Sequence, residues 1–322
     1  MISNELSIKS LNKDKYLNND FNLYNKYEFH KYLILRNDLK SIRIEIDNKF
    51  IKIYIKRYRN SFFDLNYAFI YDLDNLLYFD LCSNQKLIEK FYETLKSFRI
   101  DIISGIYTKY KESYAEIPKN NFLNLRPWET NIINTNISKN INNLRGTLKK
   151  NIKKNIGSSN FIFDIYKNKK ESIDLFKHIK YYKKSYPIIC PFIYKNNSFL
   201  NESLYSISYL NKKILSLSGI LYDSNVSIIN TTIKTKLDKE LKANSTKLLI
   251  WKILEDLNNI NINYFDFAGY SHIPRTTKEI GISSFKKNWP GRKYYFLYGD
   301  AIFISNKIKL FYKLSMIKKL LI

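Results

Sequence analysis

Residues 245–267 read STKLLIWKILEDLNNININYFDF and combine a helix with a buried strand in one short segment. Ser245 or Thr246 suits the helix N-cap, because a hydroxyl side chain can accept a hydrogen bond from the first helical turn. The helix is predicted to run to about Leu257, and residues 263–267 are predicted to form a buried strand. This order is typical of a mixed sheet that carries helices on its faces.

An antiparallel meander is predicted just before this segment, over 204–210, 214–222 and 226–233. The first half of the chain holds a shorter version of the same order. Its predicted elements are a hairpin over 41–57, strands over 67–71 and 76–81, a helix over about 84–98 capped by Ser83, and a strand over 99–107. The sequence therefore predicts an α/β chain with a mixed α+β sheet, in which one unit of meander, helix and central strand occurs twice.

The best domain boundary is the polar stretch 125–136, which separates the two units. We expect an N-terminal domain over 1–136, a C-terminal domain over 137–305 and a basic amphipathic helix over 306–322. The other predicted elements of the second half are basic helices over about 140–156 and 170–186, a strand over 161–166, a long loop after 267 and a strand over 293–303.

Length and composition exclude several classes of protein. The chain has 322 residues, of which 45% are hydrophobic, with only 8 Gly, 6 Pro and 2 Cys. These values exclude a disordered, collagen-like or disulfide-stapled chain and allow two domains with real cores. Cys82 and Cys190 stand apart from any C-x-x-C motif, so we expect no metal site, and lone cysteines fit a reducing cytoplasm.

The net charge of +25 is unevenly distributed. Residues 1–136 hold 21 basic and 17 acidic side chains, whereas residues 137–322 hold 33 and 12. An AT-rich genome would enrich lysine in both halves alike, so the excess in the second half asks for its own reason. It predicts an anionic partner there, such as a nucleic acid, or else simply solvated helix faces.

The last 17 residues, 306–322, place five lysines among apolar residues at helical spacing. Two interpretations stay open, a helix that packs on its own domain and one that lies on an anionic membrane. No apolar run reaches the ~20 residues that a membrane-spanning helix needs, and the first 14 residues lack a signal-peptide core. We expect a cytoplasmic protein that could contact the inner face of the membrane peripherally.

One region departs from the general composition, because three of the 8 glycines fall between 269 and 291. It contains Tyr264-Phe265-Asp266-Phe267-Ala268-Gly269 and ends with Gly281-Ile282-Ser283-Ser284-Phe285-Lys286-Lys287-Asn288-Trp289-Pro290-Gly291-Arg292. Glycine is used where a backbone turns sharply or approaches a ligand. A carboxylate in an apolar strand must be paired or used, which marks Asp266 as a candidate site residue.

This region resembles the C-terminal signature of the FemAB-like acyltransferases, tandem GNAT-fold proteins similar to peptidoglycan interpeptide-bridge aminoacyltransferases. Ala268 stands where family members usually carry glycine. Residues 143–154 resemble the basic helix that opens the second GNAT domain, and 215–251 resemble its meander and Trp-bearing helix. The resemblance covers about 125–305, and the first half follows it only by pattern.

The resemblance implies transfer of an acyl or aminoacyl group to an amine of a cell-envelope precursor or surface sugar. The reaction needs a stabilised oxyanion and a route for the amine proton. Lys286 is the candidate cation, or a clamp on a phosphorylated substrate, and Asp266 is the candidate for orienting Lys286 or the amine. For Asp266 a purely structural role, as a paired strand-end carboxylate, is equally open. The remaining candidate residues for substrate binding are Phe285, Trp289, Arg292, Gly269 and Gly291.

The donor stays open between acyl-CoA and aminoacyl-tRNA, and we expect no tightly bound cofactor. CoA-using GNAT domains commonly hold the pyrophosphate in a glycine-containing loop at a helix N-terminus. The matching residues Asn244, Ser245 and Thr246, with Arg145 as a further candidate, include no glycine. An aminoacyl-tRNA donor would not need that loop, and it would match the basic second half.

The rival hypothesis is a non-catalytic basic protein that binds RNA or anionic membrane and carries a decayed GNAT site. Its aromatic residues could stack on bases, although most lie at strand positions and are better explained as core. Other catalytic classes find little support, since His30, His178 and His272 are the only histidines and have no metal-ligand spacing. His272 could act as a base, or could be an exposed loop histidine without a role.

Overall fold

A computed structural model describes residues 3–4, 39–46, 49–59, 64–71, 84–106, 125–144, 146–166, 201–209 and 213–306. The predicted strand over 76–81, the predicted helix over 170–186 and nearly all of the predicted helix over 306–322 lie outside the described residues, as do both cysteines. In the described part of the chain, no helix is both long enough and apolar enough to cross a membrane.

The described strands form one mixed sheet in the order β1-β2-β3-β4-β5-β13-β6-β11-β10-β9-β8-β7, and β12 pairs with β6 beside this path. Their bounds are β1 Ser3–Asn4, β2 Leu39–Ile46, β3 Lys49–Arg59, β4 Asp64–Tyr71, β5 Ile102–Ile106, β6 Leu125–Asn134, β7 Phe161–Tyr166, β8 Asn201–Tyr209, β9 Lys213–Tyr222, β10 Val226–Lys234, β11 Tyr264–Asp266, β12 Tyr270–Ser271 and β13 Arg292–Phe303. The α-helices are α3 Gln85–Ser97, α4 Gly146–Ile156, α7 Lys236–Glu240, α8 Ser245–Asn259 and α9 Thr277–Lys287.

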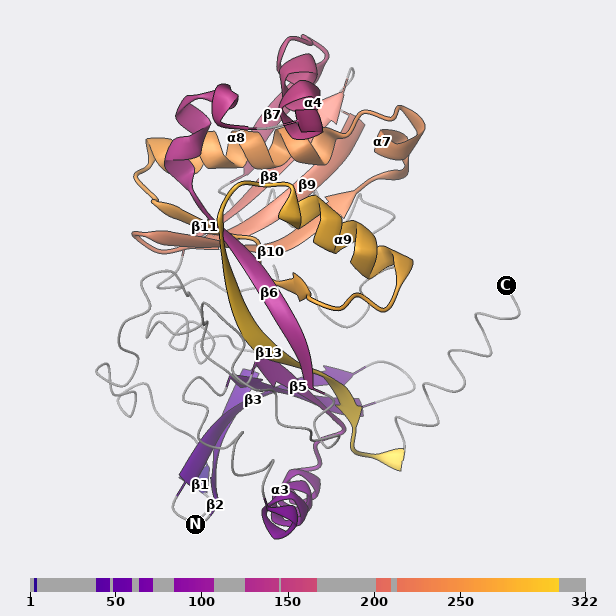
Figure 1. The fold of residues 1–322 in the computed structure, drawn as a ribbon. Helices are drawn as coiled ribbons and strands as arrows, with labels where there is room; N and C mark the ends of the chain where they lie inside the picture. The colour runs from indigo at the N-terminus through magenta and orange to yellow at the C-terminus, as the bar shows by residue number, and fades with distance from the viewer. Residues whose placement is uncertain are drawn as a thin grey trace.

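The repeated unit predicted from the sequence is confirmed. In the first half, the meander β2-β3-β4 leads into α3 and then into β5, which pairs with β4 in parallel. In the second half, β8-β9-β10 leads into α8 and then into β11, which pairs with β10 in parallel. The chain therefore has a mixed α+β fold in which this unit of meander, helix and central strand occurs twice, at opposite ends of the molecule (Figure 1).

The two units share one continuous sheet because β13 returns between them. This strand pairs with β5 of the first unit and with β6 along eight registered positions. In turn β6 pairs with β11 of the second unit. Figure 1 shows β6 and β13 running side by side through the middle of the molecule, between the two units.

The polar stretch 125–136, predicted as the boundary between the two units, contains a strand that the sequence did not predict, because residues 125–134 form β6. Several of its polar side chains are buried, among them Glu129, Thr130 and Asn131. Such residues look like loop residues in a sequence, but here they make hydrogen bonds inside the protein. Buried polar groups with partners are tolerated in a sheet, and this is why polarity misled the prediction.

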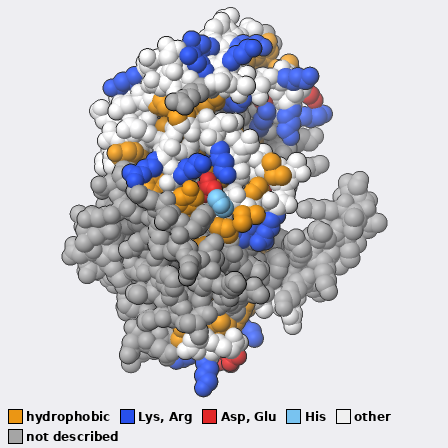
Figure 2. All heavy atoms as spheres, in the orientation of Figure 1, with side chains coloured by type: hydrophobic (Ala, Val, Ile, Leu, Met, Phe, Trp, Pro, Cys, Tyr) orange, Lys and Arg blue, Asp and Glu red, His pale blue; other side chains and the backbone are white. Residues whose placement is uncertain are grey.

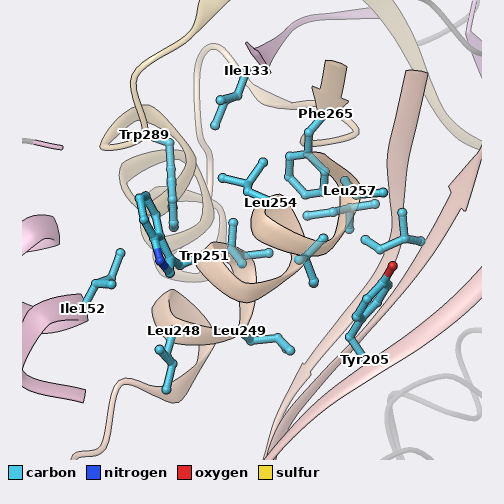
Figure 3. Packing of buried hydrophobic residues seen from close by; sticks show 14 of the residues in the cluster. Ile133, Ile152, Tyr205, Leu248, Leu249, Trp251, Leu254, Leu257, Phe265 and Trp289 are labelled. Atoms are coloured by element: carbon cyan, nitrogen blue, oxygen red, sulfur yellow. The ribbon is translucent and has the colours of Figure 1, made fainter. Parts of the chain in front are cut away.

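Each unit has its own hydrophobic core. In the first unit, α3 packs Leu87, Ile88, Phe91 and Leu95 against β2–β5. In the second unit α8 is buried on most of its surface, and Trp251 lies beside Trp289 in the core shown in Figure 3. A helix buried this deeply needs little help from its caps, since packing supplies most of its stability.

Helix starts differ from the predictions in three places. Asn84, not Ser83, caps α3 by accepting hydrogen bonds from the backbone N–H groups of Lys86 and Leu87 at 3.1 and 3.2 Å. Two 3₁₀ turns, Thr135–Lys139 and Ile141–Asn143, precede α4, which begins at Gly146 rather than near residue 140. Asn244, in a left-handed conformation, precedes α8 and makes no side-chain cap.

The predicted long loop after residue 267 is the largest error of the sequence analysis. It contains strand β12 and the three-turn helix α9. Thr276 caps α9 by accepting a hydrogen bond from the backbone N–H of Glu279. The helix was missed because its only buried residue is Ser283, so it lacks the apolar stripe that identifies a helix in a sequence.

Replacing either of two glycines by alanine is expected to change the stability of the protein, in opposite directions. A Cβ on Gly105 in β5 would lie 2.0 Å from the carbonyl oxygen of Ile70 in β4, whereas a Cβ on Gly281 in α9 would meet nothing within 4 Å. We expect Gly105→Ala to lower the free energy of unfolding by about 3 kcal/mol or more, because β4 and β5 must separate. Gly281→Ala should raise it by up to about 1 kcal/mol through helix propensity.

Urea unfolding followed by circular dichroism measures both free energies. Equal free energies of unfolding for the two variants would contradict the close approach of β4 and β5.

Candidate active site

The parallel strands β10 and β11 separate at the centre of the second unit. They pair at only three positions, the last of which joins Ile228 to Asp266. There β11 ends, while β10 continues to Lys234 along β9, with a bulge between Ile229 and Thr231. Among the described residues, no strand pairs with β10 on this side beyond Ile228. The carboxyl ends of parallel strands are where such sheets commonly bind ligands, so the point where β10 and β11 part marks a candidate site.

A tight turn carries the chain away from β11. Ala268 and Gly269 adopt φ values of 58° and 74°, in the left-handed region that glycine favours. A Cβ on Gly269 would lie 2.7 Å from the ring of Phe296 and 3.1 Å from that of Trp128. The turn is therefore pressed against aromatic side chains of β13 and β6, and position 269 requires glycine on steric grounds as well.

Lys286 of α9 holds this turn. Its ammonium Nζ donates hydrogen bonds to the carbonyl oxygen of Phe267 and, at 2.6 Å, to that of Gly269. Burial lowers the pKa of Lys286 to about 8, although the negative charge of Asp266 acts in the opposite direction. Two predicted site residues, Lys286 and Gly269, are thus brought together where the strands part.

Asp266 lies at the end of β11 and is fully buried. Its Oδ1 accepts hydrogen bonds from the Thr130 hydroxyl and, at 2.8 Å, from the Ala268 backbone N–H. The Thr130 hydroxyl also accepts a bond from the Gly269 backbone N–H at 3.2 Å. The carboxylate therefore ties the turn to β6, and its charge contributes to the electrostatics around Lys286.

The predicted acceptor residues fall into two places. The rings of Phe285 and Trp289 pack on the Phe267 ring, with centroid distances to it of 6.3 and 5.9 Å. They therefore support the turn from the hydrophobic core. Gly291 and Arg292 line a separate pocket of about 580 Å³ near the ends of β6 and β13. Its other walls are Ile132, Ile133, Asn134, Asn136, Ile137, Asn143, Tyr264, Pro290 and Tyr294.

Gly291 brings the start of β13 close to β6, because a Cβ there would lie 2.3 Å from the Asn131 side-chain oxygen. The guanidinium of Arg292 lies over the Tyr294 ring, 5.5 Å from its centroid. The pocket thus combines a cation, an aromatic face and several amide side chains.

The predicted donor residues lie at the N-terminus of α8, where the chain supplies its own anion. The carboxylate of Asp238 accepts a hydrogen bond from the Ser245 backbone N–H at 2.8 Å, and its other oxygen pairs with Lys234 at 2.8 Å. Asn244 is exposed and Thr246 is half-buried. The helix N-terminus that would attract a phosphate is therefore already compensated by Asp238. Arg145 lies outside the described residues.

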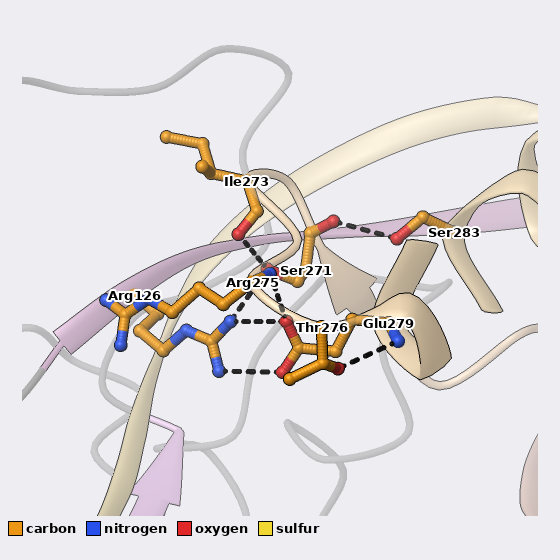
Figure 4. Close-up of polar contacts among 7 residues, drawn as sticks. All are labelled: Arg126, Ser271, Ile273, Arg275, Thr276, Glu279 and Ser283. Atoms are coloured by element: carbon orange, nitrogen blue, oxygen red, sulfur yellow. Dashed lines mark hydrogen bonds and ion pairs between the residues drawn. The ribbon is translucent and has the colours of Figure 1, made fainter. Parts of the chain in front are cut away.

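Arg126 and Glu279, which no sequence motif singled out, bind α9 to the sheet. The Arg126 guanidinium donates to both Glu279 carboxylate oxygens at 3.1 and 2.9 Å, and to the Ser271 hydroxyl at 3.1 Å (Figure 4). These hydrogen bonds, together with one from the Arg275 backbone, lower the pKa of Glu279 to about 2. The pair joins β6, β12 and α9 and so fixes the helix that carries Lys286.

Glu129 and Lys287, which were not among the predicted site residues, surround His272, for which the sequence left open a role as a base or no role at all. His272 Nδ1 is hydrogen-bonded to the buried carboxylate of Glu129, and Lys287 Nζ lies 3.6 Å from the same oxygen. No motif in the sequence links these residues, and Glu129 lies in the polar stretch that was predicted as a domain boundary. Within the described ranges, no cluster of three or more His, Cys, Asp and Glu side chains is arranged to hold a metal ion.

The depressed pKa of Lys286 predicts a pH dependence of stability. Between pH 8 and 10.5 the unfolded chain holds a proton on this lysine that the folded chain has lost, so stability rises with pH. Relative to Lys286→Met, the wild-type free energy of unfolding should therefore increase between pH 8 and pH 10. The expected slope is about 1.4 kcal/mol per pH unit at most.

Urea titrations of both proteins at four pH values measure this difference. Because other titrating groups cancel in it, a difference that stays flat or falls would refute the burial of the Lys286 ammonium.

No protein-family model and no curated protein sequence matches this chain. Among solved structures, the chain is similar to "Crystal structure of FemX", with 9% identity, coverage of 81% of this chain and 87% of that one, and a TM-score of 0.42. A tandem GNAT protein from the clavulanic acid biosynthesis pathway is similar at 5% identity, 83% coverage of both chains and a TM-score of 0.45.

Saccharomyces cerevisiae N-myristoyltransferase with bound myristoyl-CoA is similar at 15% identity, with coverage of 86% of this chain and 71% of that one and a TM-score of 0.46. A FemX structure and a tandem GNAT protein are thus among the chains that this one resembles, as its sequence motifs predicted. At these identities and TM-scores, the likeness concerns the fold and assigns neither a donor nor an acceptor.

Proposed function

We propose that the chain transfers an acyl or aminoacyl group to an amine at the opening between β10 and β11. The observation that carries this proposal is the parting of the two strands after Ile228 and Asp266, with the ammonium of Lys286 buried beside it. A carbonyl placed in the opening can accept hydrogen bonds from the β10 backbone. Such fixed donors stabilise the oxyanion that develops when an amine attacks.

Lys286 suits the role of the cation in this site. An ammonium has three N–H donors, and two are used on the carbonyls of Phe267 and Gly269. The third donor and the positive charge can act on the developing oxyanion. Since the group is already desolvated, its field at the reacting carbonyl is stronger than that of a surface lysine.

We propose an aminoacyl-tRNA, rather than acyl-CoA, as the donor. The buried carboxylate of Asp238 at the start of α8 disfavours a CoA pyrophosphate there, since it already accepts the Ser245 N–H. The second half of the chain holds 33 basic and 12 acidic residues. On α4, Lys150, Lys153 and Lys154 are exposed, and basic side chains are prominent at this end of the molecule in Figure 2.

For the acceptor we propose an amine of a cell-envelope precursor or surface sugar. The pocket beside Arg292 supports this proposal, because it offers a cation, the Tyr294 ring and the amides of Asn134 and Asn143 to a polar or anionic molecule.

We also propose a cytoplasmic location at the membrane surface, on the ground of the basic residues in 306–322. Sedimentation of the full chain with anionic vesicles tests it, and a chain that stays in the supernatant would refute it.

The first functional prediction concerns Lys286. In an assay with isotope-labelled donors and a panel of amine acceptors, Lys286→Met should lower kcat at least about 100-fold, since the oxyanion loses a donor and a charge. Lys278→Met is the matched control, because Lys278 is exposed on the same helix and should leave kcat unchanged. Folding of both variants is checked by circular dichroism. Full activity of the Lys286 variant would remove this residue from the mechanism.

The second functional prediction concerns the donor. Replacing Lys150, Lys153 and Lys154 by glutamine should weaken tRNA binding and flatten the plot of log K against log salt by up to about three units. The same replacement of Lys86, Lys90 and Lys96, which are exposed on α3, is the matched control and should change neither. Filter binding between 50 and 300 mM salt measures the slopes. Equal slopes for both triple variants would argue against tRNA at the second unit.

A further inference from the structure

Glu129 is a buried carboxylate in the middle of β6. It lies in register with Tyr270 of β12 on one side and with Tyr295 of β13 on the other. Its side chain is 2% exposed, and one carboxylate oxygen contacts both His272 and Lys287. Burying a carboxylate costs free energy unless hydrogen bonds or opposite charges compensate it. The charge of Glu129 therefore depends on the groups around it.

The partners of Glu129 keep it ionised. Burial by itself would raise the pKa of Glu129, but hydrogen bonds from His272 and Tyr270 and the charge of Lys287 outweigh burial and hold the pKa below its usual value. Lys287 is in turn placed over the Tyr270 ring, 5.5 Å from its centroid. A fixed negative charge therefore lies behind the imidazole of His272.

His272 follows β12 and is held from several sides. Its backbone N–H donates to the carbonyl oxygen of Pro127 at 3.0 Å, and its ring meets the Tyr295 ring edge-on with centroids 6.2 Å apart. The carboxylate of Glu129 fixes Nδ1 as the protonated nitrogen, which makes Nε2 the nitrogen that accepts a further proton. The His272 side chain remains 40% exposed, so its ring is oriented by the buried Glu129 carboxylate and is still accessible to solvent.

The backbone of His272 follows closely on the turn that Lys286 holds. Only Tyr270 and Ser271 separate Gly269 from His272, and an extended chain advances at most about 3.5 Å per residue, so the two Cα atoms lie within about 10 Å. Lys287, which contacts Glu129, follows Lys286 directly on α9.

We propose that His272 is the general base of the acyl transfer and that Glu129 is its positioning residue. This rests on the proposed function. The amine nitrogen attacks the carbonyl carbon of the donor ester and forms the new C–N bond. Nε2 takes the proton that the amine loses, the ester C–O bond breaks, and the imidazolium returns the proton to the departing hydroxyl. Glu129 stabilises the imidazolium and stays ionised throughout.

The test compares the wild type with His272→Gln and Glu129→Gln over pH 5 to 9, measuring kcat and KM separately. His272→Gln should lower kcat about 100-fold with little change in KM, and it should abolish the acid limb of the kcat profile. Glu129→Gln removes the charged acceptor that orients Nδ1, so kcat should fall at least about 10-fold while KM changes little. The charged and titratable groups around His272 are Glu129 of β6, Tyr270 of β12, Tyr295 of β13 and Lys287 of α9.

A role in structure alone predicts a different result, because it would scale kcat equally at every pH and leave the limb in place. If the wild type transfers and His272→Gln keeps its kcat and its acid limb, the general base is refuted while the acyltransferase stands. If the wild type transfers nothing from either donor, both proposals are overturned. Should Glu129→Gln fail to fold, His272→Gln decides alone, since its side chain is partly exposed and outside the core.

Discussion

The candidate site depends on strand β6, which connects the two units and supplies polar side chains to every part of the site. Arg126 binds Glu279 of α9, Glu129 binds His272, and Thr130 binds Asp266. Asn131 donates to the carbonyl oxygens of Lys286 and Trp289 at the end of α9, at 3.2 and 2.7 Å. Because β6 is hydrogen-bonded to β11, β12 and β13, these side chains are fixed by the sheet itself. A site carried by a central strand is more precisely positioned than one carried by loops.

The charged side chains of this site are buried, which strengthens their electrostatic interactions. Asp266 and Glu129 are buried carboxylates, and Lys286 is a buried ammonium whose pKa is lowered to about 8. Each has partners in the described structure, so none is an isolated charge. Charges held in this way lose little energy to reorganisation when a substrate changes its own charge. The same strand thus helps to hold the turn at 267–269 and, through Asn131, the end of the helix that carries Lys286, the cation proposed to act on the oxyanion.

Regular periodicity made much of the fold predictable from the sequence. The meanders, α3, α8 and the strand at 263–267 have apolar residues at strand or helix spacing, and all were found. Polarity hid β6 and exposure hid α9, since buried polar residues resemble a linker and a helix with one buried serine lacks a stripe. Lys286, Asp266 and Gly269 could be predicted because they fall in one glycine-containing motif. Glu129 and His272 are 143 positions apart, and only the pairing of β12 with β6 shows that they meet.

The central claim is that the acyl donor binds where β10 leaves β11. Amide hydrogen exchange read by mass spectrometry, with and without a non-hydrolysable aminoacyl-tRNA analogue, tests it directly. The account predicts that the analogue slows exchange in residues 229–234 of β10 and 267–272 of the adjoining turn, while β2 and β3 stay unchanged. Protection confined to other segments, with these two unaffected, would contradict it.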